Sequence, residues 1–377
     1  MIAEPKFTIG IEEEYYLVDR ETRDLVKSRP EEMMAALESR FKGQVVPEFI
    51  SSQIEVGTKV CKTIAAAGRD LRRLRKALAG AAAKHGMAII AASTHPFASW
   101  ATQSHTDKER YNILARDLQA VARRLLISGM HVHVGIEDEE LRIDLLNQVS
   151  YFLPHLLALS TSSPFWRGKE TGLKSYRIAV FDELPRTGLP EQFESWGEYQ
   201  RHVQVLIRAG VIDNASKLWW DVRPSDRFPT LEVRIPDIPT LIEDTICIAA
   251  IYLCILRMLY RLRRQNQRWR KYANMLIAEN RWRAQRYGFD AGLVDFGKGE
   301  IVPYEGLLEE IIEMVGEDAE FFGCVAEVEH ARVILQRGTS AHRQLALYHA
   351  QRKKGVDKLE ALKDVVDLLI EETTMGL

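Results

Sequence analysis

The sequence predicts an α+β fold in a single domain that spans residues 1–377. Two patterns indicate this class. Segments in which polar and apolar residues alternate, as in half-buried strands, are separated by longer segments with the apolar periodicity of helices. No linker divides the chain cleanly, and residues 288–377 are largely helical in pattern.

Alternating or short apolar segments predict six strands, in chain order Phe7–Asp19, Ser51–Val56, Ala88–Ser93, Ser128–Ile136, Leu218–Arg223 and Leu231–Ile235. Helical periodicity predicts helices over Ala65–Lys84, Asp107–Leu126, Glu139–Ser160, Ser195–Ala209, Leu241–Tyr287, Tyr304–Met314 and Ala341–Glu372. The segment Ser162–Gln192 shows neither period. Because a loop of that length inside a compact chain is usually functional or disordered, we single it out.

Composition excludes several classes of protein. Lys and Arg number 51 against 53 Asp and Glu, so the net charge of -2 creates no general attraction to nucleic acid or membrane. Four cysteines without a C-x-x-C pair do not make a disulfide scaffold or a zinc knot. The N-terminus lacks a signal-peptide pattern, and the most apolar run, Ile246–Leu256, is too short to span a bilayer. We therefore expect a cytoplasmic protein.

Four predicted strands carry acidic, histidine or arginine side chains on one face. Side chains two residues apart on a strand point to the same side, which pairs Glu12 with Glu14, Gln53 with Glu55, His131 with His133, and Glu232 with Arg234. For the two glutamates of the first strand alone, a solvated face is the more ordinary interpretation. The four strands together favour an oxygen-rich site for Mg²⁺ or Mn²⁺, because carboxylates and a histidine would converge there.

Arginine is the second recurring residue type. Basic residues occur in the aperiodic segment, on two strands and in residues 281–286, and guanidinium groups bind phosphates and carboxylates bidentately. Residues 257–286 hold ten Lys or Arg and one acidic residue, which is compatible with a solvated face, nucleic-acid binding or anionic-substrate binding. The chain has no P-loop and no strand-anchored dinucleotide motif. Bound ATP would therefore have to be held by metal ions and arginines.

Six motifs occur in an order that resembles the carboxylate–amine ligase family, the glutamate–cysteine ligase type 2 group. They are IGIEEE at 9–14, THPFA at 94–98, GMHVHVG at 129–135, PRTG at 185–188, LEVRIPD at 231–237 and NRWRA at 280–284. The motifs span residues 9–286, and the helical tail carries less of the resemblance.

The resemblance implies a glutamine synthetase-like fold, in which a curved, mainly antiparallel sheet forms a funnel with helices outside. It implies ATP- and Mg²⁺- or Mn²⁺-dependent amide formation through an acyl phosphate, between a glutamate-like acid and a cysteine-like amine. From the charge balance we expect no nucleic acid or membrane partner. A homodimer is compatible with it. The implied metal ligands are Glu12, Glu14, Glu55, His131 and Glu232. Arg234 and Arg186 would clamp phosphate or carboxylate, Arg281 and Arg283 would contribute to ATP binding, and His133 and His95 would line the funnel.

Two alternatives stay open on the sequence. The His131/His133 pair is compatible with a zinc-dependent hydrolase, for which Asp221 and Asp237 are the further ligands near suitable positions. The basic 257–286 segment is compatible with nucleic-acid binding, although the stripe is local in a nearly neutral chain.

Overall fold

A seven-stranded sheet forms the centre of the protein. The computed structural model describes residues 3–377, leaving aside the side chains of residues 110, 114 and 123. The strands of the sheet are β1 (Ile9–Asp19), β2 (Val45–Pro47), β3 (Gln53–Gly57), β4 (Met87–Ile90), β5 (Met130–Gly135), β10 (Val222–Pro224) and β11 (Thr230–Val233). Their order is β10-β11-β5-β1-β3-β2, with β4 paired to β1, and the recorded pairings are antiparallel. The sheet prediction is thereby confirmed.

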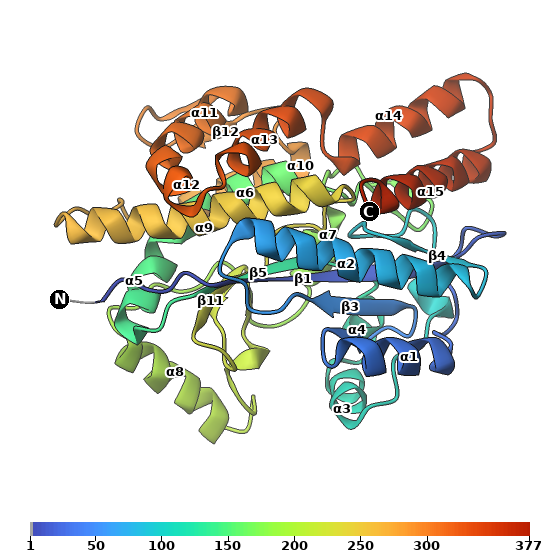
Figure 1. Ribbon diagram of the computed structural model, residues 1–377, viewed down its shortest axis with the longest axis horizontal. Coiled ribbons are helices and arrows are strands. Elements are labelled where there is room, and N and C mark those ends of the chain that lie inside the picture. Colours follow the sequence, from blue (N-terminus) through green and yellow to red (C-terminus); the bar gives the residue numbers. More distant parts are fainter. Residues whose placement is uncertain (1–2) are drawn as a thin grey trace.

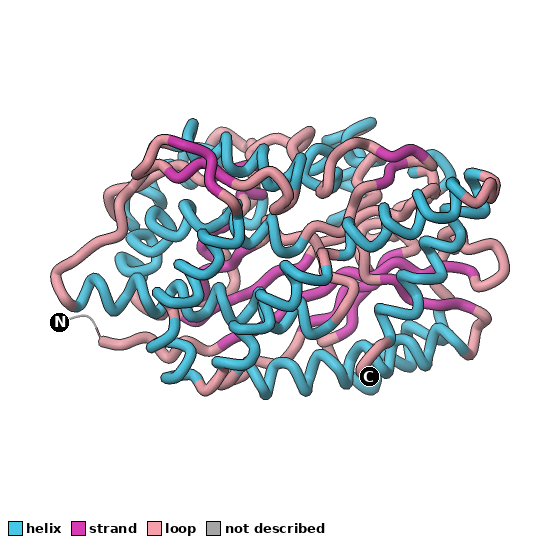
Figure 2. The backbone as a smooth tube through the Cα atoms, turned by 90° about the horizontal axis from the view of Figure 1, so that it is seen from above, coloured by secondary structure: helices cyan, strands magenta, loops and turns pink. Residues whose placement is uncertain are grey.

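Helices cover one face of the sheet in a thick layer, and others lie at the margins of the opposite face (Figures 1 and 2). They are α1 (Glu31–Phe41), α2 (Ile64–Ala83), α3 (Glu109–Leu118), α4 (Ala120–Arg123), α5 (Glu139–Val149), α6 (Leu153–Ser160), α7 (Tyr176–Phe181), α8 (Trp196–Arg208), α9 (Ile242–Arg264), α10 (Asn274–Tyr287), α11 (Tyr304–Met314), α12 (Gly316–Phe322), α13 (Val325–Arg337), α14 (Ser340–Lys353) and α15 (Lys358–Thr374). Among residues 3–377 the structure also contains three small strand pairs: β6 (Phe165–Trp166) with β7 (Lys169–Glu170), β8 (Thr187–Gly188) with β9 (Trp219–Trp220), and β12 (Leu293–Asp295) with β13 (Glu300–Val302).

The core lies between the sheet and the helices α2 and α9. The inward face of β1 contributes the buried side chains of Ile9 and Ile11, as its alternation predicts. Helix α9 is long and apolar enough to cross a membrane by length and composition, but 83% of its apolar window is buried inside the protein. That burial is typical of a core helix.

Glu13 interrupts the apolar face of β1. Its carboxylate accepts hydrogen bonds from Nε and Nη2 of Arg75 on α2 at 2.9 and 2.6 Å, and from Thr245 on α9 at 2.7 Å. Both charged side chains are fully buried. A buried ion pair needs such additional hydrogen bonds, because each charge loses its hydration. The strand is thus anchored to two helices on the side away from Glu12 and Glu14.

Several helices are shorter than the periodicity predicts. The helix expected over Asp107–Leu126 is divided at Gln119, where φ is +48°. The helix expected over Leu241–Tyr287 is two helices, α9 and α10, with an intervening turn in which Asn266 has φ +59°. The C-terminal segment is divided between α14 and α15, and Glu139–Ser160 is divided between α5 and α6 by a 3₁₀ turn at Ser150–Phe152. These single-helix predictions were wrong, because apolar periodicity continues across such breaks and does not reveal them.

Three further regions differ from the sequence-based expectation. The segment Ser162–Gln192 contains helix α7 and short strands rather than a continuous loop, and helix α1 was not expected. The strand expected over Leu218–Arg223 is divided into β9 and β10 at Asp221, because β9 pairs with β8 whereas β10 pairs with β11.

Candidate active site

The strand register brings the predicted polar faces together. Strands β11, β5, β1 and β3 are consecutive neighbours in the sheet. Glu12 lies opposite His131, Glu14 opposite Glu55, and Glu232 opposite His133. Side chains on one face of neighbouring strands stand close enough to interact. The convergence that the sequence predicts is therefore present, on the face of the sheet away from α2 and α9.

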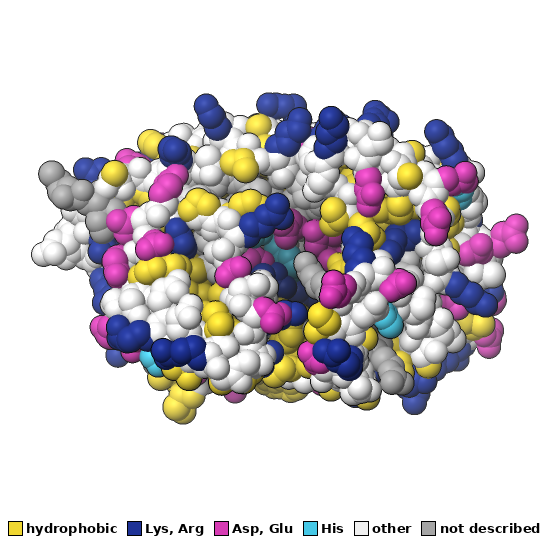
Figure 3. Space-filling model, turned by 90° about the horizontal axis from the view of Figure 1, so that it is seen from below, with side chains coloured by type: hydrophobic (Ala, Val, Ile, Leu, Met, Phe, Trp, Pro, Cys, Tyr) yellow, Lys and Arg dark blue, Asp and Glu magenta, His cyan; other side chains and the backbone are white. Residues whose placement is uncertain are grey.

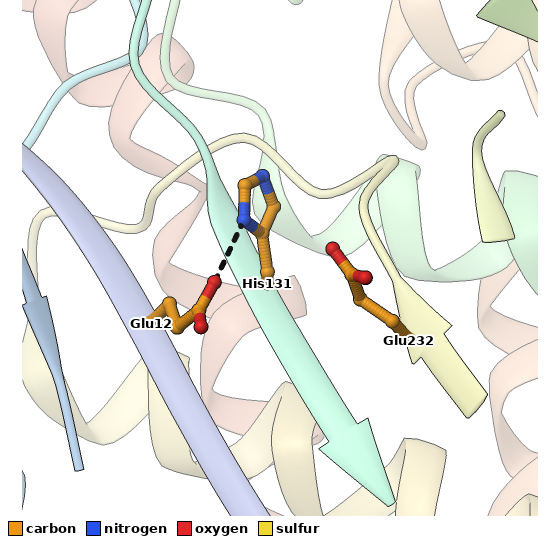
Figure 4. A group of neighbouring side chains, drawn as sticks. All are labelled: Glu12, His131 and Glu232. Carbon is orange, nitrogen blue, oxygen red and sulfur yellow. Dashed lines mark hydrogen bonds and ion pairs between the residues drawn. The ribbon is translucent and has the colours of Figure 1, made fainter. Parts of the chain in front are cut away.

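One cluster consists of Glu12, His131 and Glu232, whose candidate ligand atoms all lie within 4.8 Å of one another. Figure 4 shows the two carboxylates on either side of the imidazole, each on its own strand. Nδ1 of His131 lies 3.3 Å from Glu12, and Nε2 of His133 lies 3.5 Å from the other oxygen of Glu12. Nε2 of His133 is buried and has no hydrogen-bond partner among the described residues. A buried polar atom of this kind indicates that a ligand or water completes the site.

The electrostatics of this cluster favour charged carboxylates and a neutral imidazole. Burial opposes ionisation of Glu12, but the adjacent imidazoles of His131 and His133 hold its pKa well below the usual value. Burial likewise opposes ionisation of Glu232, yet the guanidinium groups of Arg234 and Arg223 hold its pKa far below the usual value. Burial lowers the pKa of His131 to about 4. A neutral imidazole between two carboxylates has the protonation state of a metal ligand.

The second cluster consists of Glu14, Glu48 and Glu55, again with carboxylate oxygens within 4.8 Å of one another. Burial, and then the charge of Glu48, raise the pKa of Glu14 to about 8. Burial, followed by the neighbouring carboxylates, raises the pKa of Glu55 well above its usual value. The backbone N–H of Gly129 donates to Glu14 at 2.7 Å. Three carboxylates crowded in this way repel one another unless protons or a cation intervene, so both clusters fit divalent cations that prefer oxygen.

Glu48 was missed by the sequence reasoning. It follows the short strand β2 in a connection before β3, where no alternation marks its side chain. Its carboxylate reaches the cluster because β2 is the neighbour of β3 in the sheet. That pairing, and therefore the position of Glu48, is not visible in the local pattern.

A cavity of about 960 Å³ opens over both clusters and has the size of a small-molecule site. Figure 3 shows it as a hollow, with acidic and histidine side chains at its floor and basic side chains close by. Its basic lining residues are Lys217, Arg223, Arg227 and Arg234. A second cavity of about 600 Å³ shares Glu12, Glu48, Glu55 and His133 with the first. Part of each carboxylate cluster thus lines both cavities.

Arg234 and Arg223 lie at the site, and both are bound to Glu232. Arg223 donates to the two oxygens of Glu232 at 3.0 and 3.2 Å, and Arg234 donates to Glu232 through Nη1. Nε of Arg234 is buried without a hydrogen-bond partner among the described residues. Arg234 lines the cavity, and its part as a clamp for an anionic ligand stays a prediction.

Other predicted residues do not line this cavity. Arg186 has φ +61°, donates from Nε to the carbonyl of Lys217 at 3.1 Å, and places its guanidinium over the ring of Trp219 at 5.4 Å. Since Lys217 and Trp219 line the cavity, Arg186 lies one layer behind them. His95 is buried, with one ring nitrogen 2.9 Å from the carbonyl of Arg23 and the other accepting from backbone N–H groups. The funnel-lining prediction is correct for His133 and wrong for His95.

Arg281 and Arg283 serve the framework of the protein. Arg281 makes four hydrogen bonds of 2.6–3.1 Å to Asp182 and Asp221. Arg283 donates to backbone carbonyls in the turn after α10. Both guanidinium groups are occupied by the protein itself, and neither residue lines the cavity above the clusters. Their predicted part in ATP binding therefore has no support in the geometry.

The two alternative interpretations also lose support. Asp221 is bound to Arg281, and Asp237 accepts hydrogen bonds from three serines, Ser162, Ser163 and Ser175, so neither joins the histidines as a zinc ligand. In the basic segment, several arginines are paired with acidic groups of other elements: Arg257 and Arg261 with Asp318, and Arg263 and Arg268 with Asp144. This pairing neutralises much of the stripe that was considered for nucleic acid.

Comparison with known proteins gives consistent results. The model of a family described as glutamate-cysteine ligase family 2 matches residues 8–364. A protein of Rhodospirillum rubrum, provisionally named glutamate–cysteine ligase 2, is 62% identical over 99% of this chain and 97% of its own length. A protein of the same provisional name from a Jannaschia species is 53% identical over 98% of each chain.

Solved structures show the same fold. The glutamate–cysteine ligase of Francisella tularensis, crystallised in complex with AMP, superposes with a TM-score of 0.71 at 14% identity, over 99% of this chain and 90% of that one. A bifunctional glutathione synthetase of Pasteurella multocida gives a TM-score of 0.65 at 16% identity, over 97% of this chain and 53% of that one. The predicted fold is confirmed by these likenesses.

Proposed function

The chain belongs to glutamate–cysteine ligase family 2, and on this premise we propose that it is an ATP-dependent ligase that joins the carboxyl group of a glutamate-like acid to the amino group of a second amino acid. The observation that supports this most is the convergence of two carboxylate clusters and buried arginines on one cavity. The Francisella ligase was crystallised with AMP, which is consistent with nucleotide use in this fold.

The proposed reaction has two steps. The acid carboxylate takes the γ-phosphoryl group of ATP, which gives an acyl phosphate and ADP. The amine nitrogen then attacks the acyl carbon, the C–O bond to phosphate breaks, and the nitrogen loses a proton as the amide forms. Phosphoryl transfer of this kind depends on positioning and charge stabilisation more than on a protein nucleophile.

The chain's own residues fit these tasks. Glu14, Glu48 and Glu55 would hold one divalent cation, and Glu12, His131 and Glu232 another. Mg²⁺ or Mn²⁺ bound there would neutralise the charge of the triphosphate. Arginine side chains in the cavity wall would orient phosphate or substrate carboxylate, which guanidinium groups bind bidentately.

The test is amino-acid-stimulated release of ADP. Purified protein is assayed with glutamate and a panel of amines, with Mg²⁺, with Mn²⁺ and with a chelator. Turnover should require the cation and should be lost in Glu14→Gln and Glu232→Gln, which remove a ligand charge with little change of volume. Glu371→Gln, at an exposed position of α15, is the matched control and should be unaffected. Absence of metal-dependent ADP release over the whole panel would refute the proposal.

A further inference from the structure

A recess of about 130 Å³ adjoins the main cavity beside the carboxylate clusters. The two share part of their lining, namely Glu14, Glu48, His131, Trp219 and Arg234. The recess adds an apolar wall that the main cavity does not have, formed by Phe49, Leu118, Leu125, Ile127, Phe181 and Leu184. Phe181 and Leu184 belong to the segment Ser162–Gln192, which the sequence singled out without giving it a role.

Two polar side chains of the recess, Gln53 and Arg177, are engaged by the protein itself. The amide nitrogen of Gln53 donates to the carbonyl of Ile127 at 2.7 Å and to the hydroxyl of Ser128 at 2.8 Å. The two terminal nitrogens of Arg177 donate to the carbonyls of Ile235 and Arg234 at 3.1 and 2.9 Å. A charged ligand group pushed against the apolar wall would lose its hydration without compensation. The apolar wall of the recess, away from the carboxylate clusters, therefore suits an uncharged apolar group.

We propose that this recess receives the side chain of the amine substrate, and that this substrate is an amino acid with an uncharged side chain of several carbon atoms. The inference rests on the proposed ligase function. The acid substrate is a poor candidate for the recess, because a glutamate-like acid carries a second carboxylate. A water molecule needs about 10–15 Å³ of such space, so the two-atom side chain of cysteine would leave most of the recess unfilled.

The mouth of the recess fits the remaining groups of such an amine. An amino acid whose side chain points inward has its ammonium and carboxylate groups at the boundary with the main cavity. At that boundary the guanidinium group of Arg234, which lines both the recess and the main cavity, suits the carboxylate. The nitrogen would thus lie beside the clusters proposed to hold the cations. A nucleotide base is less suited, since its polar edge requires hydrogen-bond partners that the apolar wall does not supply.

The experiment compares amines within one protein sample. The ratio of kcat/KM for leucine, methionine or phenylalanine to kcat/KM for alanine is measured with saturating ATP and glutamate. A ratio is insensitive to the fraction of protein that is folded, because both values come from the same sample. We expect the best of the larger amines to exceed alanine and cysteine by about tenfold or more, since each buried methylene contributes about that factor in a fitted pocket.

Leu125→Trp, which fills the recess, should lower this ratio about tenfold and leave the KM for ATP unchanged. Leu359→Trp, at an exposed position of α15, is the matched control and should leave the ratio as it is. Preference for alanine or cysteine, or an unchanged ratio in Leu125→Trp, would overturn the inference while leaving the ligase function intact. A raised KM for ATP would assign the recess to the nucleotide instead. Failure of every amine to stimulate ADP release would refute the ligase function, and the inference with it.

Discussion

Divalent cation binding should become tighter as the pH rises, because it displaces a proton from Glu14. Burial and the charge of Glu48 raise the pKa of Glu14 to about 8 when no cation is bound. At pH 6 the carboxyl group is therefore almost wholly protonated, and a cation must compete with that proton. For a single proton, the dissociation constant for Mn²⁺ should fall about 50-fold between pH 6 and pH 8 and change little above pH 9. If Glu55, whose pKa is also raised, released a second proton on cation binding, the dissociation constant for Mn²⁺ would depend more steeply on pH.

Isothermal titration calorimetry with Mn²⁺ measures this directly. Repeating each titration in buffers of different ionisation enthalpy gives the number of protons released per cation. Glu14→Gln mimics the protonated carboxyl group, so its affinity should be weak and its pH dependence should be shallower by one proton. A dissociation constant that is independent of pH in the unsubstituted protein, without proton release, would refute the assigned coupling between this cluster and the cation.

Three further predictions concern stability. Without divalent cations, the raised pKa of Glu14 means that the folded state holds an additional proton. The contribution of this proton to stability is complete below the unfolded pKa of about 4.5 and is lost as the pH rises through about 8. Differential scanning fluorimetry should therefore show a melting temperature that falls over this range and recovers with Mn²⁺. Arg75→Met leaves Glu13 buried without its partner and should lower the free energy of unfolding by about 3–5 kcal/mol in urea titrations. The double variant with Glu13→Leu should lose less free energy of unfolding than this single variant, because no unpaired charge remains. Equal losses in the two variants would contradict the ion-pair argument. Arg281→Ala should lower the free energy of unfolding by about 3 kcal/mol, because two aspartates lose their guanidinium partner. The KM for ATP should stay unchanged. A raised KM for ATP at unchanged stability would show instead that Arg281 takes part in ATP binding.

Much of the site could be predicted because the period of a strand is a local property. Alternation alone places Glu12 and Glu14 on one face of their strand, and His131 and His133 on one face of theirs. That these faces meet depends on strand order, which the local pattern does not contain. The resemblance implied only that these residues share one site, and the order itself comes from the pairings of β1 with β3 and β5.

The residues that were misplaced depend on partners far away in the chain. Arg281 resembles an anion-binding residue in sequence, but Asp182, 99 positions earlier, occupies its guanidinium. Glu48 has no periodic neighbours and becomes a candidate ligand only through the pairing of β2 with β3. The helix breaks at Gln119 and Asn266 require positive backbone φ angles. Neither position is a glycine, the residue that usually marks such a conformation in a sequence, so the breaks carry no clear local signal.

Because β1 carries three consecutive glutamates, shifting its pairing register by one residue would be energetically unfavourable. Moving it by one position would exchange its two faces, so that Glu12 and Glu14 would both turn toward the single guanidinium of Arg75. One of them would then be enclosed in the helical layer as an uncompensated negative charge, while the opposite surface would keep a single acid. The charge pattern of β1 therefore favours the native register over a shift by one residue, independently of any bound ligand.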